Sequence, residues 1–227
     1  MSDPPDSVLL MYAPHIVWDW NGTLFDDIAA VVDASNAAFG ELGLPPMTVE
    51  EYREWYRIPV IDCYADRLGR MPSPQEWQRM DAVFHGHYTA MRDACGLTAG
   101  ALDLLAAAGR SQSLLSMYGH EELVPLVRSF GIHEHFRRVD GRDGTSGTSG
   151  KGQYLVRHLA ALGDAVDPTR TVLIGDVPDD AAAAAEAGVR AVLYTGGAGS
   201  RRELSRVGVP VADTLAEAVS LAEALVA

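Results

Sequence analysis

Short apolar runs alternate along this chain with stretches of helical periodicity, and this alternation constrains the fold more than any other feature. Apolar runs bounded by turn residues predict buried strands over residues 15–20, 113–118, 137–140, 171–176 and 190–195. Helical patterns cover residues 102–108, 121–130, 152–162 and 180–187, and Gly188 after the last one is typical of a helix C-terminus. Strands buried on both faces and connected by helices form parallel sheets. We therefore expect an α/β fold with a doubly wound parallel sheet.

The segment between about residues 26 and 93 interrupts this alternation. It contains no convincing strand, and its three helical patterns are separated by proline-containing turns, 44–46 and 71–74. Apolar side chains recur along it at helical spacing, as expected of packing positions. The sequence thus predicts an α/β core of residues 1–28 and 93–227, with an all-helical insert over 29–92.

Composition and charge exclude several classes of protein. The 227 residues are 48% hydrophobic and 22% charged, which is close to the globular average and fits neither a disordered chain nor a membrane bundle. A formal net charge of −13 repels phosphate backbones and anionic lipids, so we expect neither nucleic acid nor a membrane as a partner. Cys63 and Cys95 are the two cysteines, too few for a disulfide framework or a cysteine zinc site. The first six residues carry two acids and no basic residue, unlike a secretory signal, and we expect a cytoplasmic protein.

Acidic residues follow two of the predicted strands. Asp19 lies at the end of the first strand, and Asp176 ends the fourth, shortly before Asp179 and Asp180. Open α/β sheets bind ligands at the carboxyl ends of their strands, and neighbouring carboxylates there suit a hard divalent cation. A simpler interpretation of Asp179 and Asp180 is that acids stabilise a helix N-terminus. The Asn21-Gly22 pair also suits a hairpin turn, although the residues after it have helical rather than alternating periodicity.

Two further side chains are candidates for binding an anion. Ser116 lies at the end of the second predicted strand, where a hydroxyl can donate to a phosphate oxygen. Lys151 is the single lysine among 18 basic residues, and its compact ammonium group is well suited to neutralising phosphate. It follows a Gly-, Ser- and Thr-rich stretch, residues 144–150, which predicts a flexible connection. Lys151 is also compatible with a solvated helix start.

Taken together and in order, Asp19 to Thr23, Ser116, Lys151 and Gly175 to Asp180 resemble the four motifs of the haloacid dehalogenase superfamily. The helical insert after the first motif lies where the phosphoglycolate phosphatase-like branch has its small helical cap. The resemblance implies a Rossmann-like core and a phosphatase in which Asp19 attacks phosphorus to form an aspartyl-phosphate. It further implies a Mg²⁺ ion held by the Asp19 carboxylate, the Asn21 main-chain carbonyl and Asp176, with Asp180 acting nearby or through water, while Ser116 and Lys151 bind the phosphoryl group. The substrate would be a small phosphorylated metabolite.

Asn21 departs from the pattern, because family phosphatases usually have at this position a second Asp that protonates the leaving oxygen and then activates water. Three interpretations follow: a slow phosphatase, a phosphatase that uses another acid or a good leaving group, or a protein that binds phosphate without turnover. We favour a slow or specialised phosphatase, since Asp19, Lys151 and Asp176 would share no purpose in a purely structural protein. A phosphonatase or phosphomutase on the same scaffold stays open.

Other classes fit the sequence less well. A P-loop hydrolase would need Gly at position 145 and a hydroxyl at 152, where this chain has Thr145 and Gly152. A dehalogenase of the same superfamily needs no metal, and Asp176 and Asp180 argue against it. The insert is expected to act as a mobile lid with hinges near residues 26–30 and 94–100. Its candidates for selecting the substrate are Arg57, Tyr64, Arg67, His85, His87 and Tyr88.

Overall fold

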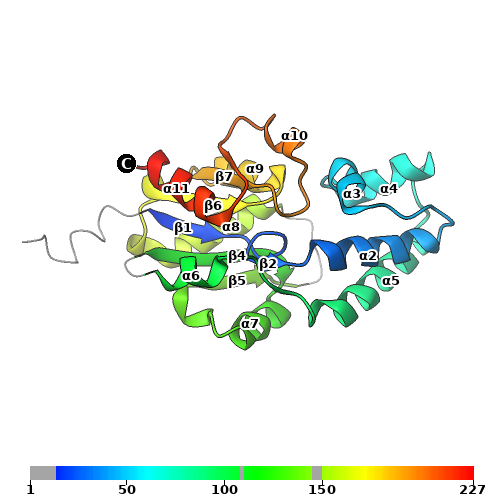
Figure 1. Cartoon of the computed structure of the whole chain (residues 1–227), viewed down its shortest axis with the longest axis horizontal. Coiled ribbons are helices and arrows are strands. Elements are labelled where there is room, and N and C mark those ends of the chain that lie inside the picture. Colours follow the sequence, from blue (N-terminus) through cyan, green and yellow to red (C-terminus); the bar gives the residue numbers. More distant parts are fainter. Residues whose placement is uncertain (1–13, 108–109, 145–149) are drawn as a thin grey trace, which may run out of the picture.

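A six-stranded parallel sheet forms the centre of the chain in a computed structural model that describes residues 14–107, 110–144 and 150–227 (Figure 1). The strands follow the order β5-β4-β1-β6-β7-β8, and every neighbouring pair is parallel. Their bounds are β1 His15–Trp18, β4 Ser111–Gly119, β5 Val139–Arg142, β6 Thr171–Gly175, β7 Arg190–Tyr194 and β8 Val211–Ala212. The predicted doubly wound parallel sheet is confirmed.

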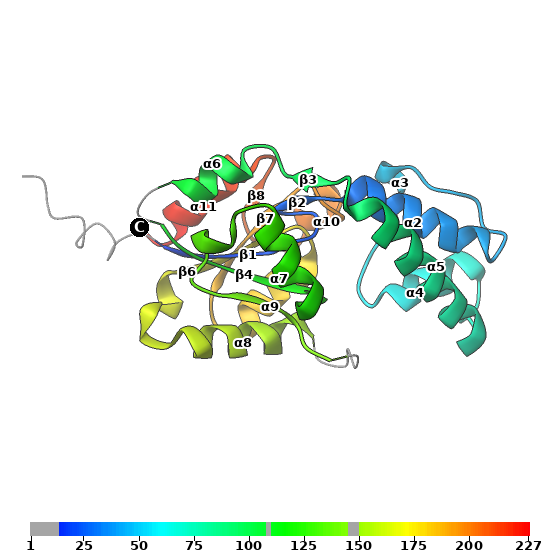
Figure 2. The ribbon, with the colours of Figure 1, turned by 90° about the horizontal axis from the view of Figure 1, so that it is seen from below.

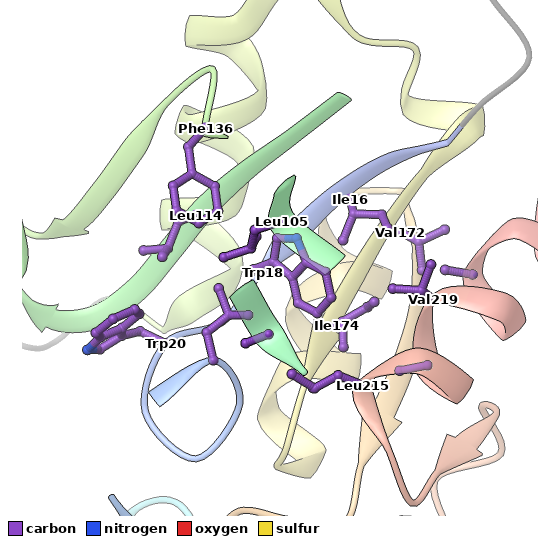
Figure 3. Close-up of a cluster of buried hydrophobic side chains, with 14 of the residues drawn as sticks. Ile16, Trp18, Trp20, Leu105, Leu114, Phe136, Val172, Ile174, Leu215 and Val219 are labelled. Carbon is purple, nitrogen blue, oxygen red and sulfur yellow. The ribbon is translucent and has the colours of Figure 1, made fainter. Parts of the chain in front are cut away.

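Helices cover both faces of this sheet (Figure 2). Ile16 and Trp18 of β1 point to one face and Val17 to the other, as alternation along a strand requires. The first face packs against α6, α7 and α11, and Figure 3 shows its apolar side chains, Leu114, Val172 and Leu215 among them. The second face packs against α8 and α9. The helices are α6 Ala101–Ala106, α7 His120–Ser129, α8 Lys151–Leu162, α9 Pro178–Glu186, α10 Arg201–Leu204 and α11 Leu215–Leu225, with 3-10 turns at η1 His133–His135, η2 Gly163–Ala165 and η3 Pro168–Arg170.

The insert contains four helices where the sequence predicts three helical patterns. They are α2 Ile28–Gly40, α3 Val49–Trp55, α4 Val60–Leu68 and α5 Pro74–Arg92. Figures 1 and 2 both show them beyond one end of the sheet, with α2 beside α5. Their buried side chains form a separate cluster around Phe39, Tyr64 and Met80. Two short antiparallel strands that the sequence does not predict, β2 Phe25–Asp26 and β3 Gly96–Leu97, lie where the chain enters and leaves the insert.

Local differences from the sequence predictions concern the ends of elements. Ser116 lies within β4 and not at its end, because the strand predicted over 113–118 continues to Gly119 after a register shift against β5 between Leu115 and Gly119. The Asn-Gly pair makes no antiparallel hairpin; Asn21 instead forms an isolated parallel bridge with Phe25. Residues 145–149 of the predicted flexible connection and the N-terminal residues 1–13 lie outside the described residues. Over the described ranges, no helix is both long and apolar enough to span a membrane.

Candidate active site

The carboxyl ends of β1 and β6 bring the predicted acids together. Asp19 follows β1 and Asp176 follows β6, and these strands are direct neighbours paired from His15 with Thr171 to Trp18 with Ile174. Asp180 lies in the first turn of α9 and is fully buried, as are Asp19 and Asp176 to within a few per cent. One carboxylate oxygen from each of the three lies within 4.8 Å of the others. The sequence prediction that these acids share one place is therefore correct.

Lys151 lies between two of these carboxylates. Its ammonium nitrogen is 2.7 Å from Asp19 Oδ1, and it also donates to Asp180 Oδ1. It is the first residue of α8, and only 4% of its surface is exposed. A solvated helix start is thus excluded for Lys151. The other oxygen of Asp180 accepts the backbone N–H groups of Asp176 and Val177, each at 3.0 Å, which fixes this carboxylate against the end of β6.

Asp176 is positioned by two loops. Its Oδ2 accepts the backbone N–H of Ala198 at 2.7 Å, and its Oδ1 accepts the hydroxyl of Thr23 at 3.3 Å. Both loops approach the carboxylate so closely that a Cβ at Gly22 or Gly197 would lie within 2.6 Å or 2.1 Å of Asp176 Oδ2. The loop after β7 was not predicted from the sequence, although its Gly196-Gly197-Ala198-Gly199 run is a signal for close backbone approach.

Burial makes the acidic cluster electrostatically unfavourable by itself. Desolvation raises the pKa of Asp19 to about 6, and the negative charge of Asp180 adds to the rise while Lys151 opposes it. Desolvation also raises the pKa of Asp176 well above its ordinary value, with further contributions from Asp19 and Asp180. If all three acids ionise, Lys151 leaves two negative charges unbalanced, which equals the charge of one divalent cation. The donor set also suits such an ion, because it consists of closely spaced, buried carboxylate oxygens.

Hydrogen bonds to Asp27 and Tyr88 fix the Asn21 side chain. Its Nδ2 donates to Asp27 Oδ2 at 2.7 Å and to the Tyr88 hydroxyl at 2.8 Å, and that hydroxyl donates to the same Asp27 oxygen at 2.6 Å. The Gly22 N–H satisfies the second Asp27 oxygen at 2.8 Å. In the loop around Asn21, the Phe25 N–H donates to the Trp20 carbonyl oxygen and the Gly22 N–H donates to the Phe25 carbonyl oxygen. Asp27 is a residue that the sequence analysis missed.

The site opens into a cavity of about 410 Å³ between the sheet edge and the insert. Asp19, Asn21, Ser116, Lys151, Asp176 and Asp180 all line it, so the cavity contains every predicted site residue. Ser116 lies beyond the part of β4 that pairs with β1, and its Oγ accepts the Tyr118 N–H at 3.0 Å. That bond does not use the hydroxyl proton of Ser116.

The candidates for substrate selection divide into two groups. Tyr64, His85 and Tyr88 line the cavity. Arg57 instead pairs with Asp66, while Arg67 donates to the Pro45 carbonyl and lies over the Phe39 ring. His87 is exposed on α5. This cavity is not lined by Arg57, Arg67 or His87.

Arg53 is a second residue that sequence reasoning missed. From α3 in the insert, its guanidinium donates to the carbonyl oxygens of Gly197 and Gly196, both at 2.8 Å. A neighbouring ion pair joins Glu54 of α3 to Arg202 of α10. These contacts connect the insert to the loop whose Ala198 N–H holds Asp176.

Comparison with known proteins agrees with this geometry. A family model described as haloacid dehalogenase-like hydrolase matches residues 16–194, which is most of the chain. The chain belongs to this family. The resemblance predicted from the four motifs is confirmed, including the phosphoglycolate phosphatase-like branch, and with it the prediction of a phosphatase.

Curated relatives and solved structures cover almost all of the chain. A phosphoglycolate phosphatase from Chromobacterium violaceum is 26% identical over 81% of this chain and 85% of its own length. A 5'-nucleotidase from Pseudomonas aeruginosa is 24% identical over 84% of this chain and 86% of its own. The crystal structure of a putative phosphoglycolate phosphatase from Lactobacillus delbrueckii subsp. bulgaricus superimposes with a TM-score of 0.76 at 22% identity, covering 95% of this chain and 98% of that one. These similarities establish the fold, while the relatives differ in the substrates for which they are named.

Proposed function

We propose that this member of the haloacid dehalogenase-like family hydrolyses a small-molecule phosphate monoester through an aspartyl-phosphate on Asp19, with Mg²⁺ as its metal. One observation carries the proposal. Asp19 lies buried at the cavity, with one carboxylate oxygen bound to Lys151 and with Asp176 and Asp180 close by. This arrangement offers a nucleophile, a cation for the phosphoryl group and a set of hard oxygen ligands in one place.

The residues that would hold the metal are Asp19, the Asn21 main-chain carbonyl and Asp176, with Asp180 nearby. Asp180 is already engaged by Lys151 and by two backbone N–H groups, so its role fits orientation of Lys151 better than direct coordination. A bound divalent cation supplies charge that offsets the repulsion between the phosphate dianion and the carboxylates, and it polarises a phosphoryl oxygen. The protein's own side chains would carry out the other parts of the reaction.

The reaction has two steps. A carboxylate oxygen of Asp19 attacks phosphorus, the bond between phosphorus and the ester oxygen breaks, and that oxygen leaves as an alkoxide or aryloxide with the electron pair of the bond. Water then attacks phosphorus, the bond between phosphorus and Asp19 breaks, and the Asp19 carboxylate is regenerated. The two protons of the water go to the released phosphate, which passes one of them to the departed alkoxide or aryloxide. Lys151 stabilises negative charge on the phosphoryl oxygens, and the Ser116 hydroxyl donates to another of them.

Asn21 affects this reaction because its side chain has no acid or base group. An amide neither protonates the leaving oxygen nor activates water, and general acid/base catalysis commonly contributes about 10²–10⁴ in rate. The side chain instead donates to Asp27 and to Tyr88 at the entrance to the insert. We therefore propose a slow or specialised phosphatase, specialised for esters whose alcohol leaves without a proton.

A second candidate function rests on the same residue. A protein with Lys151, Ser116 and the acidic cluster but no acid/base residue would bind a phosphate ligand without turning it over. Small phosphorylated molecules are the proposed partners in both cases, and a cytoplasmic location is part of the proposal. Phosphonate cleavage or phosphosugar mutation would use the same Asp19 chemistry.

Phosphate release from phenyl phosphate tests the proposal. We expect turnover with Mg²⁺ and loss of turnover in excess EDTA, with restoration when Mg²⁺ is added back. Asp19→Asn should reduce the rate to background, about 10³-fold or more, whereas Asp33→Asn at an exposed position of α2 should leave it unchanged. Mass spectrometry after acid quenching should find a phosphorylated peptide that contains Asp19. Undiminished turnover in EDTA, or in the Asp19→Asn variant, would refute the mechanism, and absence of turnover with retained phosphate binding would favour the second candidate.

A further inference from the structure

We infer that the site takes phosphate esters of uncharged aromatic alcohols, in preference to esters whose alcohol carries a carboxylate. This inference rests on the proposed function and specifies its substrate class. It comes from two independent features of the molecule: the side chains that line the cavity, and the amide at position 21.

Aromatic side chains of the insert form one wall of the cavity. They come from α3, α4 and α5 and from the segment between α3 and α4, and include Trp55, Tyr56, Tyr64, Trp77, Phe84 and Tyr88. Several pack edge to face or tilted, such as Trp55 with Tyr64 at 5.4 Å and Tyr64 with Trp77 at 5.7 Å between ring centroids. A flat aromatic group can be received by such a wall through the same stacked and edge contacts.

The charges around the cavity disfavour an anionic alcohol. Lys151 is the only Lys or Arg among the described residues that line the cavity, and it is already bound to Asp19 and Asp180. The other acids that line the cavity outside the cluster are Asp27, Asp81 and Asp179, and the Nε2 of a lining histidine, His85, lies 3.4 Å from Asp81. A second carboxylate on the substrate would be desolvated beside these acids without a cation to pair with it, which is costly.

The cavity volume agrees with a ligand larger than a two-carbon acid. Pockets of roughly 300–1,000 Å³ are typical of sites for drug-sized ligands, and this cavity measures about 410 Å³. An aromatic ring placed against Trp77 and Phe84 would fill space that a short chain leaves to water. Filling an apolar wall in this way contributes affinity in proportion to the apolar area removed from water.

The amide at position 21 leads to the same class of substrate. Phenol-like hydroxyls have a pKa near 10, so an aryloxide leaves without being protonated, whereas an alkoxide is far more basic and needs an acid. The Asn21 side chain cannot serve as that acid, and its Nδ2 donates to Asp27 and Tyr88. An aromatic alcohol therefore suits both the aromatic lining of the cavity and the first step of the reaction, for which Asn21 supplies no acid.

Binding and turnover of matched compounds test the inference separately from the proposed function. Calorimetry with Mg²⁺ present compares phenylphosphonate with 4-carboxyphenylphosphonate, which differ by one carboxylate. We expect the uncharged compound to bind at least tenfold more tightly, and phenyl phosphate to be hydrolysed with at least tenfold higher kcat/KM than either cyclohexyl phosphate or phosphoglycolate. Equal or reversed binding would overturn the inference whether or not any ester is hydrolysed. If no ester is hydrolysed but the binding preference is as expected, the proposed function fails and the inferred ligand class stands.

A charge substitution in the cavity provides the matched control. Asp81 lines the cavity with half of its side chain exposed, and Asp33 is an exposed acid of the same insert that does not line it. Asp81→Lys should shift the ratio of the two binding constants at least tenfold toward the carboxylated compound, while Asp33→Lys leaves the ratio unchanged. Equal shifts in both variants would show that overall charge, not the lining of the cavity, sets the preference, and would overturn the inference.

Discussion

At the scale of single residues, the main chain and the side chain of Asn21 differ in function: its carbonyl is a proposed metal ligand, whereas its amide cannot act as an acid. Asn21→Asp restores an acid/base group at this position, so we expect turnover of an alkyl phosphate to rise by about 10²-fold or more. The first step on an aryl phosphate should change little, because its leaving oxygen needs no proton. A carboxylate can also activate water in the second step on either substrate, so the rate of alcohol release in the first turnover, compared for cyclohexyl and phenyl phosphate, measures the difference.

The neighbour of Asn21 determines the control for this experiment. The Asn21 amide nitrogen lies 2.7 Å from Asp27 Oδ2, so a carboxylate at position 21 meets a buried carboxylate at hydrogen-bond distance. Like charges so close repel, and one of the two acids must hold a proton. The double variant Asn21→Asp with Asp27→Asn exchanges the two groups and removes the repulsion. The double variant should recover the melting temperature that the single variant loses. An equal rise in the first-turnover rate of Asn21→Asp on both substrates would contradict the leaving-group argument.

A buried histidine gives the protein a pH dependence that is independent of the active site. His15 in β1 is hydrogen-bonded to Ser111 and Ser113, and Ser113 also contacts His158, which pairs with Asp140. Burial lowers the pKa of His15 to about 3, with further lowering from the charges of His158 and Arg137. His15 is therefore protonated below about pH 6.5 in the unfolded chain, but only below about pH 3 in the folded chain. Lowering the pH through this window therefore costs stability, on the order of a few kcal/mol.

Urea unfolding across this window tests the assignment to His15. Replacing His15 by Gln should lower the free energy of unfolding at pH 7, because buried hydrogen bonds are lost. The difference between wild type and this variant should shrink as the pH falls from 6.5 toward 3. His87→Gln on the exposed face of α5 is the control and should follow the wild-type curve. A constant difference between wild type and His15→Gln over the whole range would show that another group titrates.

At the scale of elements, the core could be predicted from sequence because its strands are continuous apolar runs between turn residues. Each of the five predicted strands exists, although β1, β6 and β7 end one or two residues early. Asp19 and Asp176 could be located for the same reason, since each lies where an apolar run stops. The local sequence does not indicate that Ser116 lies within β4, because the register shift after Leu115 depends on pairing with β5.

The parts of the site that escaped prediction depend on backbone atoms and on contacts between distant elements. The Ala198 N–H holds Asp176, and the carbonyls of Gly196 and Gly197 accept Arg53. Backbone atoms make these contacts, so the sequence signals the close approach of the glycine-rich loop but not the partners of its N–H and carbonyl groups. Asp27 was missed because it precedes α2, where an acid is ordinary at a helix start, and its partners Asn21 and Tyr88 meet it only in the folded chain.

One element end offers a direct test of how the insert is held in shape. Ser73 caps α5: its Oγ accepts the Glu76 N–H at 3.2 Å, and the Glu76 carboxylate accepts the Ser73 N–H at 2.8 Å. Ser73→Ala removes the side-chain acceptor and should lower stability by about 1 kcal/mol. Urea unfolding followed by tryptophan fluorescence measures the loss, since Trp77 lies in the next turn of α5. Ser220→Ala in α11, which does not cap a helix, should cost much less, and equal losses would deny the cap its role.

At the scale of the whole molecule, the insert lies over the carboxyl end of the sheet and shares one cavity with Asp19 (Figure 1). The mobile lid with hinges near residues 26–30 and 94–100 stays a prediction, and the structure supplies the contact that would hold it closed. Arg53 binds two carbonyl oxygens of the loop after β7, and that same loop donates to Asp176. Closure of the insert and positioning of the Asp176 carboxylate would therefore depend on one loop.

Arg53→Ala tests this coupling. Hydrogen bonds from a charged group are worth about 1.5–3 kcal/mol each, so losing both should favour the open insert and lower kcat/KM by roughly tenfold or more, through KM. Arg53→Lys keeps the charge but cannot donate to both carbonyls with one planar group, and it should fall between Ala and wild type. Arg79→Ala, at an exposed position of α5 outside the cavity, controls for loss of charge from the insert. If Arg53→Ala and Arg79→Ala have the same kcat/KM, the bridge from α3 to the loop does not govern access to Asp19.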